Sequence, residues 1–204
     1  MADIPYKLSF TVGALLVREA VIAAPLYLET RNWTMVRSLL DDDNLLQART
    51  DSTRRRIGRE VVQRLESLTE AEVALFVDST ATERGHLMWV ATCRTYDLIG
   101  EFAENVLRER FLLMIPTLAP PDFDNFFHSK SLWHEELTEL ADSTRQRLRS
   151  NVFLMLREAD LLSEIGEIAP TTLSQRVVDV LTDTNQNDFR FFPTHAAPTQ
   201  ESVR

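Results

Sequence analysis

The sequence predicts an all-α fold, a multi-helix bundle, and three observations indicate it. Only 5 Gly and 8 Pro occur among 204 residues, which suits long helices better than a turn-rich β sandwich. Apolar residues recur at helical spacing in several long segments. Helix-capping residues precede such segments, for example Thr69 with Glu72 three positions later.

The first forty residues are expected to form two helices. Residues 11–31 carry apolar side chains at helical spacing, and Pro25 should bend or break this helix. Asn32 is a suitable N-cap for a second helix over residues 33–40. A polar turn is then expected at residues 41–44.

The middle of the chain is expected to be almost entirely helical. Asp51 or Thr50 can cap the main helix of this region, and Thr69 caps the next one. The expected segments are 45–48, 52–68, 70–76 and a long helix at 81–105 that residues 106–115 can continue.

Three prolines within residues 116–122 make this stretch the best candidate for a domain boundary. We therefore predict an N-terminal helical domain over 1–116, a C-terminal helical domain over 120–192 and a disordered tail over 193–204. The second domain should contain helices at 123–127, 132–140, 143–162 and 173–181, a polar connection at 164–172 with room for a small hairpin, and Phe189, Phe191 and Phe192 packed back onto the core.

The charge of the chain is unevenly distributed. The formal net charge is −9, yet residues 45–66 carry six Arg against three acidic residues, and residues 142–158 carry four against two. Arginine accounts for 20 of the 22 basic residues, and its guanidinium makes bidentate contacts to phosphate that lysine cannot make. A GC-rich genome would produce the same bias. The two basic segments still contrast with an acidic background.

Each basic segment contains the same motif. Residues 51–57 read Asp-Ser-Thr-Arg-Arg-Arg-Ile, and residues 142–148 read Asp-Ser-Thr-Arg-Gln-Arg-Leu. Both are expected to start a helix, where the positive end of the helix dipole disfavours arginine. A bound anion such as a nucleic-acid phosphate would offset that cost.

At about 100° per residue, the helix over 52–68 has two distinct faces. Ile57, Val61, Leu65 and Leu68 form an apolar stripe, and Arg54 lies over it as a structural residue. The face turned away from the core carries Arg55, Arg56 and Arg59.

A short helix, a turn and a longer helix with a polar start follow the order of a helix-turn-helix. Arg55, Arg56 and Arg59 are therefore the first candidates for phosphate contacts, with Ser52 and Thr53 supporting them through their hydroxyls. Arg49 and Arg147 are second candidates. Arg147 has less weight because the second half of its helix, predicted over 143–162, has the apolar pattern of a core helix. The alternative is a solvated charged face on which Glu60 and Glu66 form salt bridges with these arginines.

No catalytic motif is evident. Glu83 and His86 form a Glu-x-x-His pair, but a di-iron bundle needs a second such pair, and none occurs. The four histidines are scattered, and neither a nucleotide-binding Gly-rich loop nor a Gly-x-Ser-x-Gly elbow is present. We predict a non-catalytic protein with no cofactor, no metal and no small-molecule substrate.

The sequence favours a cytoplasmic location. The single cysteine, Cys93, lies in an apolar segment and is expected to be buried and reduced. No basic segment precedes an apolar run near the N-terminus, so no signal peptide is expected. The most apolar stretch, residues 12–28, is interrupted by Arg18 and Glu19 and reads as a buried helix of a soluble protein, not as a membrane span.

Parts of the chain resemble the BrxA family, the small helical component of bacterial BREX phage-defence systems. The resemblance lies in Leu-Ser-Phe-Thr-Val-Gly-Ala-Leu-Leu from residue 8, in Trp33 and Val36, in Asn-Leu-Leu-Gln-Ala-Arg-Thr-Asp-Ser-Thr-Arg-Arg-Arg-Ile from residue 44, and in Leu-Glu-Ser-Leu-Thr at 65–69. It covers most of the chain and is most specific at residues 44–69.

This resemblance implies an all-helical fold with a core similar to the antitermination factor NusB. It also implies non-catalytic binding of double-stranded DNA within a phage-defence system, with other BREX proteins as further partners. Two alternatives remain open. The chain could be a protein-interaction subunit whose acidic surface docks partners, or an RNA-binding protein, for which Trp33 is the aromatic residue nearest the arginine face.

Overall fold

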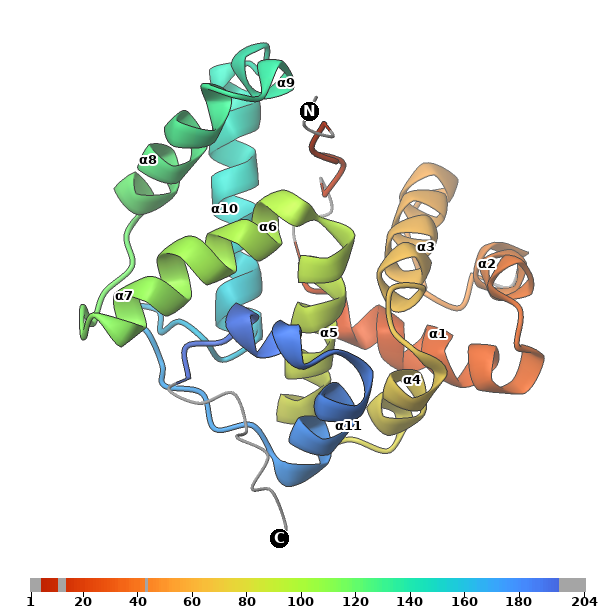
Figure 1. The fold of residues 1–204 in the computed structure, drawn as a ribbon. Helices are drawn as coiled ribbons and strands as arrows, with labels where there is room; N and C mark the ends of the chain where they lie inside the picture. The colour runs from red at the N-terminus through yellow and green to blue at the C-terminus, as the bar shows by residue number, and fades with distance from the viewer. Residues whose placement is uncertain (1–4, 11–13, 43, 195–204) are drawn as a thin grey trace, which may run out of the picture.

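The computed structural model describes residues 5–10, 14–42 and 44–194, and it confirms the predicted all-α class. Within these ranges there is no strand, and the chain makes two isolated antiparallel bridges, Thr117 with Glu167 and Leu162 with Ile168. The second bridge closes a small hairpin at the start of the connection where the sequence left room for one. Figure 1 shows the helices arranged around α5.

The first four helices form one packed group, drawn in orange to yellow in Figure 1. Their bounds are α1 Val17–Thr30, α2 Trp33–Asp42, α3 Asp51–Leu65 and α4 Glu70–Val77. α1 packs against each of the other three, and α2 packs against α3.

α1 differs from the prediction at its start. It begins at Val17 after Leu16, which has a left-handed backbone (φ 63°), and residues 11–13 lie outside the described residues. The helix runs through Pro25 and does not end there. Ala20, Ala23 and Ala24, in the turns that precede Pro25, are fully buried, so tertiary packing offsets the hydrogen bond that proline removes.

The connection between α2 and α3 is not helical, contrary to the short helical turn predicted at 45–48. Asn44 and Gln47 have positive φ values, 45° and 51°, which a right-handed helix does not allow. Asn44 spans the turn with its amide, accepting from the Ala48 backbone N–H at 3.0 Å. α2 in turn extends to Asp42, so Asp41 and Asp42 belong to the helix and not to the predicted polar turn.

Three predicted caps are confirmed. The Asn32 side chain accepts from the Met35 backbone N–H at 3.1 Å at the start of α2. Thr50 caps α3, and Thr69 forms a capping box with Glu72 at the start of α4. These contacts satisfy backbone N–H groups that have no partner inside the helix.

The long helix predicted at 81–105 is interrupted. α5 (Ala81–Thr95) ends at Tyr96, whose backbone is extended (φ −129°, ψ 96°), and α6 (Asp97–Phe102) starts after it. A π-helical segment, Ala103–Arg108, then leads into α7 (Glu109–Leu112). The Tyr96 hydroxyl donates to Glu60 on α3 at 2.6 Å. Tyr96 and Glu60 are 36 residues apart, so helical spacing around Tyr96 does not predict this contact or the break beside it.

The remaining helices lie where expected with shifted ends. They are α8 Pro120–Ser131, α9 Glu135–Thr138, α10 Asp142–Glu158, α11 Gln175–Asn185 and a 3₁₀ segment Gln186–Phe191. α8 is longer than predicted because Pro120 stands at its first position and the Asp122 carboxylate accepts from the Ala119 N–H at 2.7 Å. The predicted helix at 132–140 is reduced to the single turn of α9.

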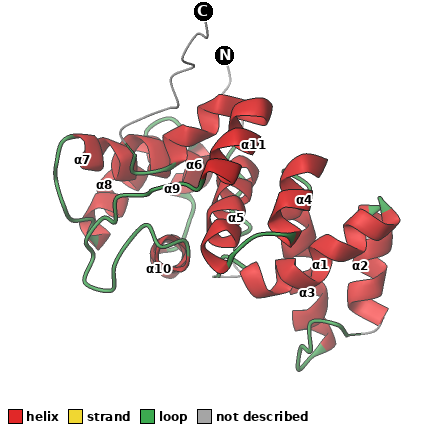
Figure 2. Cartoon of the chain, turned by 90° about the horizontal axis from the view of Figure 1, so that it is seen from below, coloured by secondary structure: helices red, strands yellow, loops and turns green. Residues whose placement is uncertain are grey.

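One hydrophobic core runs through the described residues, with α5 near its middle (Figure 2). Trp89 on α5 is fully buried, and its indole N–H donates to the Phe191 carbonyl at 2.9 Å, confirming that the C-terminal phenylalanines pack back. Cys93 is buried as predicted, and burial raises the pKa of its thiol. The core draws residues from both sides of 116–122, and the division into two domains stays a prediction.

The sequence predicts a disordered tail over 193–204 and no membrane-spanning helix. Of the predicted tail, residues 195–204 lie outside the described residues, and the Pro193 carbonyl accepts from Thr171 N–H at 3.1 Å. Among the described residues, no helix has both the length and the apolar character needed to span a bilayer.

Candidate nucleic-acid interface

The start of α3 is organised by Thr50. Its hydroxyl oxygen accepts from the Thr53 backbone N–H at 3.2 Å and donates to the Thr53 hydroxyl at 2.9 Å. Arg49 and Ser52 are exposed beside this cap. Three hydroxyls, one exposed guanidinium and the free N–H groups of the first helical turn therefore lie at one end of α3, where the helix dipole favours an anion.

The two faces of α3 lie as the helical spacing predicts. Val61 and Leu65 are fully buried against the core. Arg55, Arg56 and Arg59 are exposed, whereas the Arg54 side chain is only 18% exposed, in keeping with a structural role. Three guanidinium groups thus face solvent on one side of this helix.

Arg54 and Arg55 share one carboxylate. Arg54 Nε donates to Asp41 Oδ1 at 2.6 Å, and Arg55 Nε donates to Asp41 Oδ2 at 3.1 Å. Arg54 also pairs with Asp51 at 3.0 Å. The hydrogen bond from Arg54 lowers the pKa of Asp41, and Arg55 contributes in the same direction. The same contact raises the pKa of Arg54.

An open pocket of about 270 Å³ lies between α2 and α3. We call it the arginine pocket, and it is lined by Arg37, Asp41, Arg54, Arg55, Gly58 and Arg59. Gly58 is buried, and a Cβ atom at this position would lie 3.9 Å from the Leu40 side chain. Gly58 therefore lies where α3 meets α2, and an added Cβ would make only an ordinary van der Waals contact there.

The charges around the arginine pocket are only partly balanced. Arg37 Nη2 lies 2.5 Å from Glu66 Oε1, while Arg37 Nε is buried without a hydrogen-bond partner in the described part of the chain. Arg59 Nε donates to the Arg55 carbonyl at 3.3 Å, and Arg59 makes no ion pair among the described residues. Arg59 is exposed and the Arg37 side chain is 40% exposed, so both guanidiniums present donor groups to the pocket, although Arg37 Nε itself is buried.

The acidic residues expected to neutralise the arginine face are engaged elsewhere. Glu60 is 6% exposed, accepts from the Tyr96 hydroxyl at 2.6 Å and pairs with the fully buried Arg64 at 2.8 Å. Glu66 pairs with Arg37 on α2. The interpretation in which Glu60 and Glu66 hold Arg55, Arg56 and Arg59 is therefore wrong. Packing of α3 against α5 and α2 turns both carboxylates away from that face.

The second Asp-Ser-Thr-Arg segment starts α10, as predicted, and its Asp142–Arg145 ion pair repeats the Asp51–Arg54 pair of the first segment. Arg145 pairs with Asp142 at 3.1 Å, and Arg149 pairs with Asp124 at 2.5 Å. Arg147 is exposed and makes no ion pair among the residues that the structure describes. α10 packs against α5 and α8, and Arg147 is not part of the arginine pocket.

α2 and α3 pack together. Figure 1 shows α2 nearly along its axis and α3 from the side, so the two helices cross and are not parallel. Such a crossing is compatible with a helix-turn-helix, which stays a prediction. Trp33 stacks on Tyr27 with ring centroids 3.9 Å apart and an interplanar angle of 6°. This ring is therefore engaged between α1 and α2 and is not a free platform for a base.

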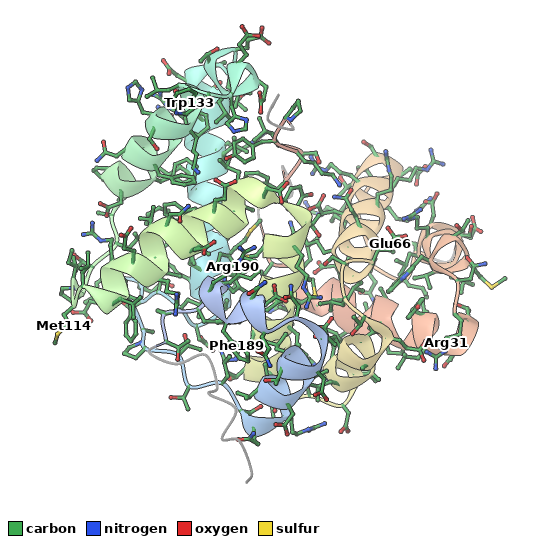
Figure 3. All side chains as sticks on the ribbon, viewed as in Figure 1. Arg31, Glu66, Met114, Trp133, Phe189 and Arg190 are labelled. Atoms are coloured by element: carbon green, nitrogen blue, oxygen red, sulfur yellow. The ribbon has the colours of Figure 1, made fainter. Side chains whose placement is uncertain are left out.

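Helical spacing on α3 alone could not identify Arg37 and Asp41. Both lie on α2, four residues apart, and therefore on one face of that helix. The four-residue spacing could have indicated that Arg37 and Asp41 share a face. The predicted helix ends at residue 40, however, and Asp41 is assigned to the polar turn. Figure 3 shows the side chains between α2 and α3, with Glu66 labelled at the end of α3.

Comparison with known proteins gives one matching family model and curated relatives that are similar over much of the chain. The family model BrxA matches residues 4–185. The curated BREX protein BrxA of Paramagnetospirillum magneticum (strain ATCC 700264 / AMB-1) is 24% identical over 188 residues, covering 91% of this chain and 94% of that protein. The BREX protein BrxA of Escherichia coli O9:H4 (strain HS) is 24% identical over 147 residues, covering 72% and 69%.

A solved structure shares the fold. The crystal structure of an uncharacterized protein from Magnetospirillum magneticum superposes with a TM-score of 0.81 at 22% sequence identity, covering 93% of this chain and 98% of that one. The arrangement of helices in Figure 1 is therefore found in another protein.

Proposed function

The chain belongs to the BrxA family, and from this premise we propose that it is a component of a BREX-type phage-defence system that binds double-stranded DNA without catalysis. In this proposal the protein acts in the cytoplasm and also contacts other BREX proteins. Its DNA contacts are made through the arginine-rich start of α3.

The observation that carries the proposal is the exposed arginine face of α3 in an acidic protein. Arg55, Arg56 and Arg59 face solvent, while Glu60, the acidic residue of the same helix that follows Asp51, is buried and pairs with Arg64. A chain with a net charge of −9 repels DNA on average, so binding requires such a local concentration of positive charge.

The proposed contacts are mainly to the DNA backbone. The three guanidiniums bind phosphate oxygens through charge-assisted hydrogen bonds, and Ser52 and Thr53 add hydroxyls at the positive end of the helix dipole. Arg49 and Arg147 make secondary phosphate contacts. Contacts of this kind position a protein on the duplex and carry little sequence information, so we expect weak sequence preference.

A charge-reversal variant tests the proposal. Arg55→Glu combined with Arg59→Glu should weaken binding to a short duplex by about 60-fold or more at ~0.1 M salt, since two phosphate contacts are lost. Fluorescence anisotropy measures the affinity, and circular dichroism checks that helicity is kept. A matched control, Arg176→Glu with Arg190→Glu, makes the same charge change on α11 and the 3₁₀ segment.

Two outcomes would contradict the proposal. Unchanged affinity of the Arg55/Arg59 variant with wild-type helicity would remove α3 from the interface. An equal loss in the control variant would mean that net charge, and not this face, determines binding.

A second candidate function, protein docking, is favoured by exposed apolar residues on the side opposite α2 and α3 in Figure 3. Trp133 is 80% exposed next to Leu132, and Met114 is 86% exposed next to Leu113. Exposed apolar patches mark interaction sites. Under this proposal other BREX proteins dock there, and Trp133→Ser should abolish their co-purification without affecting duplex affinity.

RNA binding is the remaining alternative, and direct comparison separates it from DNA binding. Affinities for duplex DNA, single-stranded DNA and RNA are measured at about physiological salt. Recognition of single-stranded RNA usually relies on free aromatic rings, and Trp33 is stacked on Tyr27. We expect the duplex to bind most tightly, and tighter RNA binding would overturn the proposed function.

A further inference from the structure

Asp41 occupies the arginine pocket from within the protein. Its two carboxylate oxygens point to different arginines, Oδ1 to Arg54 Nε at 2.6 Å and Oδ2 to Arg55 Nε at 3.1 Å. The carboxylate comes from α2 and both guanidiniums come from α3. One anionic group with two acceptor oxygens is thus held between two helices by side-chain donors.

We propose that the arginine pocket is a phosphate-binding site and that Asp41 holds it in place of a phosphate until a DNA backbone phosphate displaces the carboxylate. The inference rests on the proposed function for its ligand, because DNA supplies the phosphate. It adds a defined site, an internal competitor and two residues, Arg37 and Asp41, that the exposed face of α3 does not include.

The chemistry of the pocket suits this exchange. Guanidinium groups bind carboxylate and phosphate with the same paired hydrogen-bond geometry. A phosphodiester presents two charged oxygens, as Asp41 does. Beyond the two donors that Asp41 uses, the pocket has Arg59, which makes no ion pair among the described residues, and Arg37, whose side chain is 40% exposed and pairs with Glu66 through Nη2. A phosphate would therefore gain donors that the carboxylate leaves unused.

Space and position are also suitable. The pocket volume of about 270 Å³ exceeds that of several water molecules at roughly 30 Å³ each, which leaves room for a phosphate group. The pocket is open, and Arg55 and Arg59 also belong to the exposed face of α3. A duplex lying on that face would bring its backbone to the mouth of the pocket.

Asp41 consequently sets how strongly the pocket attracts DNA. Displacing the carboxylate costs two hydrogen bonds to guanidinium, so the observed affinity is lower than that of an open pocket. Removing the negative charge of Asp41 should free Arg54 and Arg55 and tighten binding. A neutral residue at a position outside the pocket should not have this effect.

The test compares Asp41→Asn with Asp42→Asn. Both variants remove one negative charge from the end of α2, but Asp42 is exposed and makes no ion pair in the described ranges. We expect Asp41→Asn to bind a short duplex about tenfold more tightly at ~0.1 M salt, because no carboxylate has to be displaced from Arg54 and Arg55. The log–log salt slope should stay close to that of the wild type, since a phosphate occupies the pocket in both complexes. Asp42→Asn should change affinity by less than about threefold.

A second pair of variants keeps the inference testable if Asp41→Asn does not fold. Arg37→Gln removes a pocket arginine that is paired with Glu66, and Arg31→Gln removes an arginine at the end of α1 that is similarly paired with Glu70. We expect Arg37→Gln to reduce the salt slope by about 0.9 and Arg31→Gln to leave it unchanged.

The outcomes separate this inference from the proposed function. If wild type binds the duplex and loses it on Arg55/Arg59 reversal, but folded Asp41→Asn behaves like Asp42→Asn, the pocket inference is overturned and the function stands. If no variant binds the duplex, the function fails, and calorimetric titration with inorganic phosphate decides the pocket. If Asp41→Asn binds inorganic phosphate more tightly than the wild type does, the arginine pocket is a site for free phosphate. If neither protein binds inorganic phosphate, the pocket inference is overturned.

Discussion

The salt dependence of DNA binding gives the most direct measure of the arginine face. Arg56 and Arg59 are both exposed and make no ion pair within the described part of the chain, so both guanidiniums are available to phosphates. Arg55 is less suitable for this measurement because it shares Asp41. We therefore predict the effect of replacing Arg56 and Arg59 together by Gln.

The expected magnitude follows from the number of free guanidiniums. Each phosphate contact contributes about −0.9 to the slope of log affinity against log salt. Losing two contacts should make the slope shallower by about 1.8. Between 50 and 200 mM salt the affinity of the variant should consequently fall about 12-fold less than that of the wild type.

Fluorescence anisotropy with a labelled duplex at four or more salt concentrations measures both slopes. The control is Arg176→Gln with Arg190→Gln, which removes two surface arginines that each pair with one acid, Asp78 and Glu104. Its slope should match the wild type. An unchanged slope in the Arg56/Arg59 variant, or the same shift in the control, would refute the assignment of phosphate contacts to α3.

Three further predictions concern stability. Arg64→Met leaves the Glu60 carboxylate buried without its partner and should lower the free energy of unfolding in urea by about 3–5 kcal/mol, whereas adding Glu60→Leu should recover part of this loss. The side chain of Glu83 accepts hydrogen bonds from Ser174 and Thr80, which lower its pKa from 4.5 to about 2, so its contribution is present above pH 4.5 and lost as the pH falls toward 2. The stability advantage of wild type over Glu83→Gln should thus shrink between pH 5 and pH ~2, and a pH-independent difference in thermal unfolding would contradict this reasoning. Gly100→Ala places a Cβ 3.0 Å from the Cys93 carbonyl and should destabilise the fold by about 1–3 kcal/mol in the same urea assay.

Much of the candidate site was predictable because it depends on local geometry. The caps at Asn32, Thr50 and Thr69 follow from side chains that accept a hydrogen bond from the backbone N–H three residues further on. The exposure of Arg55, Arg56 and Arg59 follows from the 3.6-residue period once the apolar stripe of α3 is known.

Other parts of the site were not predictable from spacing. Glu60 shares α3 with the exposed arginines, yet contact with Tyr96 and Arg64 buries it. The break at Tyr96 separates α5 from α6 within an otherwise helical pattern. The repeated Asp-Ser-Thr-Arg motif begins a helix and holds one ion pair at both places, Asp51 with Arg54 and Asp142 with Arg145. In the first copy Asp41 of α2 also contacts Arg54 and Arg55, and helical spacing does not predict that contact.

The sequence by itself determined the helical class, the capped helix starts and the arginine face of α3, because hydrogen bonds and side-chain direction within a helix depend on residues only a few positions apart. Only the tertiary structure decided which charges are free. The packing of α2 on α3 brings Asp41 between Arg54 and Arg55 and places Arg37 in the same pocket, across 13 or more positions of sequence. Such pairings depend on where two helices meet, and helical spacing alone does not specify that.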